Sequence, residues 1–148
     1  MPDYSIPLSV PSIHGNEWQY VKECLDTEWV SSAGKYVDLF EEKVSEYTGA
    51  KYTISCVNGT SALQVSLRLA GVQPGDEVIV PTLTFIAPAN MVVLSGAKLV
   101  LVDVHPETLT INPTLIEENI TKNTKAIIVV HQFGHSAHMD EIIEIAVK

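Results

Sequence analysis

Only two cysteines, Cys24 and Cys56, occur among the 148 residues of the chain. Two lone cysteines without paired spacing indicate neither a disulfide framework nor a zinc site. The sequence also lacks an apolar run of the roughly 20 residues that cross a bilayer, and its N-terminus does not resemble a signal peptide. We therefore expect a cytoplasmic protein with no structural metal ion and no membrane partner.

Basic residues are also scarce. Lysine and arginine together number 9 against 18 aspartates and glutamates, which gives a formal net charge of −9. Proteins that bind nucleic acids present a basic face, so we expect no nucleic acid partner. A small anionic ligand stays compatible with this charge, because backbone dipoles can hold such a ligand locally.

The apolar fraction of 46% is sufficient for a buried core. Helical spacing of apolar residues predicts two helices in the first 50 residues, joined by the loop TEWVSSAGKY. From residue 51 a strand-and-helix unit repeats, and its strands are apolar runs typical of a parallel sheet covered on both faces. The pattern predicts an α/β fold. The expected strands are residues 52–57, 77–80, 98–103 and 125–130, and the expected helices are 17–25 (capped by Asn16), 35–47, 61–70, 86–95, 113–120 and 139 to the end.

The segment ISCVNGTSALQVSLRLAG changes from an apolar strand to a buried helix through Asn58, Gly59, Thr60 and Ser61. Ligands of open parallel sheets bind beyond the carboxyl ends of the strands. The first turn of a helix also carries N–H groups without intrahelical partners, which favour an anion such as a phosphate group. The two hydroxyls can add hydrogen bonds, and Gly59 permits close approach to the backbone. The alternative is that Asn58 or Thr60 only caps the helix.

Two common phosphate-binding motifs are missing from the sequence. It contains neither the G-x-x-x-x-G-K-[ST] loop nor a G-x-G-x-x-G after a strand. We call residues 58–61 the hinge. A phosphate group held at the hinge would therefore belong to something other than ATP or NAD.

The second predicted strand ends in PTLTFIAPAN, where we expect Thr84 to cap the next helix. Phe85 would then lie at the rim of the same face as the hinge. An aromatic ring in that position could stack on a flat ligand. The alternative is that Phe85 belongs to the hydrophobic core.

Polar residues also follow the third and fourth predicted strands. Asp103 closes the third strand, where an aspartate more often caps a turn than takes part in chemistry. His131, His135 and His138 have a spacing that resembles a metal cluster. Gly134 interrupts helical geometry there, and no cysteine or carboxylate completes a ligand set, so we expect no metal site.

These segments together resemble the DegT/DnrJ family of pyridoxal-phosphate-dependent nucleotide-sugar aminotransferases. The resemblance rests on N-G-T-S-A-L, G-D-E-V-I-V-P, T-F, V-D-V, T-K-A-I-I and V-H-x-x-G, which occur in the family's order. It covers nearly the whole chain from about Ile6. The stretches TEWVSSAGKYVDLFEE and VPTLTFIAP are closest to the branch that makes 4-amino sugars of the bacillosamine or legionaminic type.

The resemblance implies an aspartate-aminotransferase-like fold (fold type I) and a homodimer whose subunits share the active site. It implies transfer of an amino group, usually from glutamate, to a keto group of a nucleotide sugar, with pyridoxal 5′-phosphate as cofactor. Thr60 and Ser61, supported by Gly59, would hold the cofactor phosphate, and Phe85 would stack on the pyridine ring.

The resemblance also implies a division of the chain. Residues 1–50 would form an N-terminal segment with two helices and a substrate-side loop, in which Ser31, Ser32 and Lys35 would shape the nucleotide-sugar site. Residues 51–148 would form the N-terminal part of the cofactor-binding large domain.

The family's chemistry depends on an aspartate that pairs with the pyridine nitrogen and a lysine that bonds to the cofactor. Asp103, Asp140 and Lys148 do not match those positions, and both family motifs lie beyond the last residue of the sequence. We therefore expect the N-terminal portion of an aminotransferase, with an incomplete sheet, no catalytic residue of its own and no activity alone. The alternative is a truncated, non-catalytic relic or interaction protein of the same fold.

Overall fold

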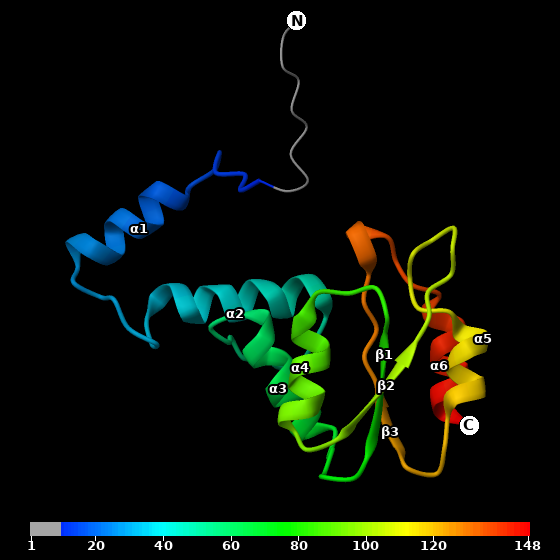
Figure 1. Cartoon of the computed structure of the whole chain (residues 1–148). Helices are drawn as coiled ribbons and strands as arrows, with labels where there is room; N and C mark the ends of the chain where they lie inside the picture. The colour runs from blue at the N-terminus through cyan, green and yellow to red at the C-terminus, as the bar shows by residue number, and fades with distance from the viewer. Residues whose placement is uncertain (1–9) are drawn as a thin grey trace, which may run out of the picture. The chain divides into compact units, whose positions relative to one another are not determined.

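The computed structural model describes residues 10–148 and divides the chain into two compact units (Figure 1). The first unit ends at Ser55, and the second unit spans Cys56–Lys148. No helix in the described range has the length and apolar content needed to cross a bilayer.

The first unit contains helices α1 (Glu17–Asp26) and α2 (Lys35–Thr48), which confirm the two helices predicted from apolar spacing. Gly49 ends α2 with a left-handed backbone, at φ 72°, which glycine adopts without steric cost. Neither helix contributes a buried residue. Several large apolar side chains of both helices, such as Trp18 and Phe40, are exposed in this chain.

The second unit is built on a parallel sheet with the strand order β2–β1–β3. Its strands are β1 (Glu77–Pro81), β2 (Lys98–Val102) and β3 (Thr124–Ile127). Ile79 of the central strand is in register with Val100 on one side and with Ile127 on the other. The three predicted strands in this part of the sequence are confirmed, although β3 ends three residues earlier than expected.

Two helices cover each face of the sheet (Figure 1). Helices α3 (Gly59–Leu69) and α4 (Ile86–Leu94) pack on one face, and α5 (Pro113–Asn119) and α6 (Met139–Val147) pack on the other. A short 3-10 turn at Gln132–Gly134 precedes α6. The predicted doubly covered α/β fold is therefore confirmed.

The central strand β1 supplies the core on both faces of the sheet. Val78 and Val80 belong to the cluster under α3 and α4, whereas Ile79 belongs to the cluster under α5 and α6. All three side chains are fully buried. Side chains alternate between the faces of a strand, so a continuous apolar run is needed where both faces are covered.

The strand predicted at residues 52–57 is wrong, because these residues belong to no strand. Tyr52, Ile54 and Val57 are 76–87% exposed. An apolar segment becomes a strand only when a neighbouring strand pairs with its backbone, and none does so within residues 10–148. Instead, the Glu41 carboxylate accepts hydrogen bonds from the Ser55 backbone N–H at 2.7 Å and from the Ser55 hydroxyl at 2.9 Å.

The end of the sheet at which its strands begin holds a buried carboxylate that the sequence pattern did not identify. Glu77 is only 5% exposed and pairs with the Lys98 ammonium group at 2.8 Å. The Thr121 hydroxyl donates to the same carboxylate at 2.6 Å. The hydrogen bond from Lys98 and then that from Thr121 lower the pKa of Glu77 below its usual value. The carboxylate thus joins β1, β2 and the turn before β3.

This network predicts a loss of stability in acid. A carboxylate whose pKa is lower in the folded state contributes stability above its unfolded pKa, and this contribution disappears as the pH falls through the folded pKa. We expect the Glu77 contribution to be present above about pH 4.5, the ordinary glutamate value, and to be lost below it. Glu77→Gln should remove that contribution, so the denaturation midpoint of the variant should be lower at neutral pH and should fall less on acidification. Equal acid sensitivity of the two proteins would contradict this assignment; Glu42→Gln, on exposed helix α2, is the control.

Candidate functional site

The first turns of α3 and α4 lie at the edge of the sheet that is formed by the carboxyl ends of its strands. β1 runs from Glu77 to Pro81, and α4 begins five residues later at Ile86, so the start of α4 is at that edge. α3 packs along α4 (Figure 1), and its C-terminal end leads through Gly71 toward the opposite edge, where β1 begins. The two helix starts therefore lie on the side where ligands of parallel sheets bind.

Asn58 caps α3, as expected, whereas the question of whether this turn also holds an anion stays a prediction. Its backbone is extended and its side-chain oxygen accepts a hydrogen bond from the Ser61 N–H at 2.9 Å. The helix begins at Gly59, two residues earlier than predicted. The hinge of the sequence analysis is thus a cap followed directly by the first helical turn, and capping occupies only one of its backbone donors.

The other donors of this turn remain available. The backbone N–H groups of Gly59 and Thr60 and the hydroxyls of Thr60 and Ser61 make no hydrogen bond within the described part of the chain. Open space lies next to Gly59, because a Cβ built there meets no atom within 4 Å. Free N–H groups at the positive end of an 11-residue helix, two hydroxyls and room beside a glycine suit a phosphate group.

Phe85 directly precedes α4, and its side chain is 78% exposed. The alternative that Phe85 is a core residue is therefore wrong. The expectation that Thr84 caps α4 is also wrong, because Phe85 occupies the N-cap position and no side chain caps this helix. The ring is accessible on the side of the sheet where the α3 turn lies, as stacking on a flat ligand requires.

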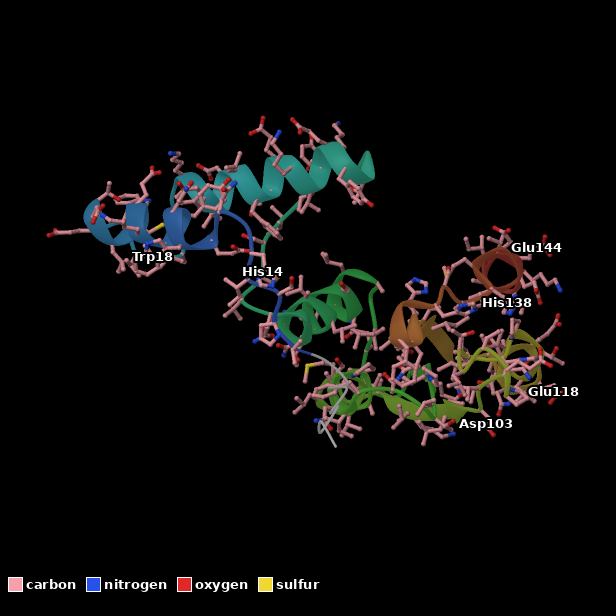
Figure 2. The ribbon with its side chains drawn as sticks, turned by 90° about the horizontal axis from the view of Figure 1, so that it is seen from above. His14, Trp18, Asp103, Glu118, His138 and Glu144 are labelled. Atoms are coloured by element: carbon pink, nitrogen blue, oxygen red, sulfur yellow. The ribbon has the colours of Figure 1, made fainter. Side chains whose placement is uncertain are left out.

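Asp103, labelled in Figure 2, directly follows β2 and is hydrogen-bonded to Thr82, which directly follows β1. Its Oδ1 atom accepts a hydrogen bond from the Thr82 hydroxyl at 2.8 Å and another from the Val104 N–H at 2.8 Å. The Thr82 bond and then the Val104 bond lower the pKa of the Asp103 carboxyl. The Val104 bond joins adjacent residues, and the turn at residues 106–108 follows His105 instead, so the turn-capping role is not confirmed; the bond to Thr82 was not anticipated.

The histidines after β3 do not gather into a ligand set. The Nδ1 atom of His131 accepts a hydrogen bond from the Ala137 N–H at 3.1 Å. His138 instead approaches Glu141, with 3.5 Å between Nδ1 and Oε1. Across residues 10–148 no three histidine, cysteine, aspartate or glutamate side chains are arranged to hold a metal ion.

Lys35, one of the three residues expected on the substrate side, lies at the start of α2 in the first unit. Its ammonium group pairs with Glu23 of α1 at 2.6 Å, and the Tyr36 hydroxyl donates to the same carboxylate at 2.6 Å. These bonds, the one from Lys35 first, lower the pKa of Glu23. Ser31 and Ser32 are exposed in the preceding loop. Whether these three side chains bind a substrate is not tested by this geometry, and the role stays a prediction.

A pocket opens beside Lys35, between α1 and the start of α2. The Trp29 indole lies against Gly34 so closely that a Cβ at position 34 would collide with it. Gly34 also has φ 145°, which is accessible mainly to glycine. The pocket is lined by Glu23, Cys24, Thr27, Trp29, Ala33, Gly34, Lys35, Tyr36 and Asp38.

Sequence reasoning missed Glu23 and Thr82 for a common reason. Glu23 lies 12 positions before Lys35, and Thr82 lies 21 positions before Asp103. Neither spacing is a local periodicity that marks a contact on one helix or strand. A usable signal existed for Thr82 alone, since polar residues directly after neighbouring parallel strands meet at one edge of the sheet.

Comparison with known proteins gives consistent matches over this chain. The sequence profile of the DegT/DnrJ/EryC1/StrS aminotransferase family matches residues 11–148. A GDP-perosamine synthase of Caulobacter vibrioides is 48% identical over 95% of this chain and 38% of the relative. A UDP-2-acetamido-2-deoxy-3-oxo-D-glucuronate aminotransferase of Pseudomonas aeruginosa is 49% identical over 78% of this chain and 32% of the relative.

A solved structure agrees with these sequence relatives. NtdA from Bacillus subtilis, with bound cofactor PMP, superposes with a TM-score of 0.83 and 38% identity, over 88% of this chain and 30% of that protein. The chain thus spans between about a third and two fifths of the length of the curated relatives named above.

Proposed function

Because the chain belongs to the DegT/DnrJ/EryC1/StrS aminotransferase family, we propose that it is the N-terminal portion of a pyridoxal-phosphate-dependent aminotransferase acting on a nucleotide-linked keto sugar. The single observation that carries this proposal is the first turn of α3. Its Gly59 and Thr60 N–H groups and its two hydroxyls have no partner within residues 10–148, and open space lies beside Gly59, in the segment that carries the family motif N-G-T-S-A-L.

We assign the cofactor phosphate to the Gly59 and Thr60 N–H groups and to the Thr60 and Ser61 hydroxyls. Hydrogen bonds to an ionised group are the strong ones, and the helix dipole favours a dianion at this position. The Asn58 side chain holds the Ser61 N–H at 2.9 Å, so it fixes the shape of the turn on which the other donors depend. Asn58 would therefore act by keeping the donors convergent.

Phe85 would set the plane of the cofactor ring. Its ring is 78% exposed and its backbone lies at the start of α4, so it can cover one face of a flat heterocycle. Pyridoxal phosphate, when bound, supplies a carbonyl that exchanges amino groups and a pyridine ring that withdraws electron density. The residues of this chain bind and orient, and the groups that move protons would be contributed by the remainder of the enzyme.

The amino acceptor would be a sugar linked to a nucleoside diphosphate, and the donor would be glutamate. Relatives named for GDP-linked and UDP-linked sugars both match this chain, so we assign the substrate class without choosing the nucleotide. Residues 51–148 would belong to the cofactor-binding large domain. Ser31, Ser32 and Lys35, in the segment 1–50, would contact the substrate.

We further propose that the complete enzyme is a cytoplasmic homodimer. Helices α1 and α2 contribute no buried residue and carry large exposed apolar side chains, including Trp18 at 70%, Phe40 at 56% and Tyr47 at 93% exposure. A second copy of the chain is an occupant that would remove such surfaces from water. Cys24 and Cys56 are both free thiols, which suits a reducing compartment.

The test of this function uses the full-length protein. Purified enzyme with added pyridoxal phosphate should develop visible absorption from bound cofactor, and glutamate should change that spectrum as the amino group is transferred. A panel of GDP-linked and UDP-linked keto sugars should then identify the acceptor by restoring the first spectrum. If neither cofactor nor glutamate alters the absorption, the assignment fails.

Lys35 offers a separate test of the substrate side. If its ammonium group contacts the diphosphate of the substrate, Lys35→Ala should raise KM for the nucleotide sugar by about 10-fold, the value of one charge-assisted hydrogen bond, and should leave kcat nearly unchanged. Lys43→Ala is a matched control, because Lys43 lies on the same helix and pairs with Glu46 at the same distance of 2.6 Å. An equal effect of both variants on KM would reject a specific role for Lys35.

A further inference from the structure

Thr82 is tied to β2 by both its backbone and its side chain. Its N–H donates to the Val102 carbonyl at 2.9 Å, which continues the β1–β2 ladder by one residue. Its hydroxyl donates to Asp103 Oδ1 at 2.8 Å. The residue directly after β1 is therefore held at two points, at the place where the chain leaves the sheet for the α4 turn.

Asp103 is itself firmly held. Its Oδ1 atom also accepts from the Val104 N–H at 2.8 Å, and its carbonyl accepts from the Asn112 N–H at 3.1 Å. A bridge between Val104 and the fully buried Ile111 closes the loop that follows. The Thr82 bond, and then the Val104 bond, lower the pKa of the Asp103 carboxyl further below neutral pH, and the ionised carboxylate is a strong acceptor.

Phe85 lies between this attachment and a helix with one buried face. Only Leu83 and Thr84 separate it from Thr82, and α4 is anchored in the core through Met91 and Val92. The ring is 78% exposed, so packing around the side chain does little to restrain it. No side chain caps the start of α4. The position of the ring therefore depends on the backbone of residues 82–85, and that backbone depends on the bond between Thr82 and Asp103.

We propose that Asp103 and Thr82 are positioning residues that hold the loop 82–85 in place and thereby set the orientation of the Phe85 ring toward the cofactor. This inference rests on the proposed function, because it gives Phe85 the role of a stacking platform. Neither residue is assigned contact with the cofactor.

The test measures the loop and the affinity separately in the full-length enzyme. In the cofactor-free protein, Thr82→Val should accelerate amide hydrogen exchange at residue 82, whose N–H donates to the Val102 carbonyl at 2.9 Å, by about 10-fold, the size of one hydrogen bond to a charged group. It should weaken the equilibrium binding of pyridoxal phosphate, titrated by visible absorption, by about 5- to 10-fold. Asp103→Ala should produce the same two changes.

Conservative variants and a control separate positioning from general damage. Thr82→Ser retains the hydroxyl and Asp103→Asn retains an acceptor oxygen, so both should restore slow exchange and most of the affinity. Thr114→Val makes the same chemical change at an exposed site on α5, where the hydroxyl forms no hydrogen bond within the described residues, and should alter neither quantity. Failure of both conservative variants to rescue would overturn the positioning role.

A double-mutant cycle with Phe85→Ala separates a failure of this inference from a failure of the proposed stacking role of Phe85. If Phe85→Ala weakens cofactor binding and Thr82→Val adds nothing further in that background, the two residues act through one ring, as proposed. If the two effects on cofactor affinity are fully additive, the positioning inference is wrong, but the stacking role of Phe85 is retained. If Phe85→Ala leaves cofactor binding unchanged, the platform role itself is wrong and the inference fails with it.

Discussion

Replacing Thr60 with valine and Ser61 with alanine in the full-length enzyme is expected to weaken pyridoxal phosphate binding by about 100-fold or more. Each hydroxyl is assigned one hydrogen bond to the phosphate, and a hydrogen bond to a charged group contributes about 1.5–3 kcal/mol, roughly 10- to 100-fold in affinity. Both side chains are half-buried and free of other partners in the described chain, so their loss should leave the fold intact. Equilibrium titration followed by visible absorption measures the change.

Two further variants on the same helix sharpen this prediction. Ser66→Ala removes an exposed hydroxyl from α3 away from the first turn and should leave the affinity unchanged. Gly59→Ala should change protein stability and cofactor affinity in opposite directions. A Cβ at this position meets no atom of the chain within 4 Å, but it enters the space assigned to the phosphate. The protein should be as stable as before or more stable, since the unfolded chain loses freedom, while cofactor affinity should fall.

The outcome that contradicts this site is equally specific. Normal cofactor affinity in the double variant would leave Asn58 as a helix cap and nothing more, which is the alternative explanation for this turn. Circular dichroism of each variant should match that of the unsubstituted enzyme, so that weak binding is not mistaken for unfolding.

Truncating the central strand is the second large effect expected. Ile79→Ala should lower the free energy of unfolding by about 4 kcal/mol, within the usual range for removing a buried isoleucine side chain. Ile79 is fully buried in the middle strand, and its side chain packs with Val102, Ile111 and Ile142 under the α5–α6 layer. A loss of this size is a large fraction of the stability of an ordinary domain.

The measurement is chemical denaturation of the cofactor-free enzyme, with two variants for calibration. Ile79→Val removes one methyl group and should cost about 1 kcal/mol. Leu101→Ala, on the neighbouring strand β2, removes a side chain that is 54% exposed and should cost clearly less than Ile79→Ala. An equal loss of unfolding free energy in Ile79→Ala and Leu101→Ala would contradict the central place of β1 in the hydrophobic core.

Predictions from local pattern succeeded where the residues within a segment are sufficient to define its secondary structure. The apolar spacing of α1 and α2, the run of valine and isoleucine in β1, and the Asn112–Pro113 start of α5 each define an element through nearby residues. Asn112 indeed caps α5 by accepting a hydrogen bond from the Thr114 N–H at 3.1 Å.

The segment at residues 52–57 shows where such reasoning ends. Its composition is that of a strand, yet strand formation needs a partner, and a sequence window does not contain that partner. Phe85 illustrates the same limit for burial, because an aromatic residue beside an apolar helix could have faced the core. Only the packing of α4 through Pro88, Met91 and Val92 left the Phe85 ring exposed.

The sequence by itself determined the alternation of strands and helices, the family and the donors of the α3 turn, because these depend on residues that are neighbours in the chain. The tertiary structure alone decided that β1 is central, that Glu77 is buried against Lys98 and Thr121, and that Asp103 reaches Thr82. Those contacts join residues 21 to 44 positions apart. Parallel pairing brings them together, and no local periodicity encodes which strand lies beside which.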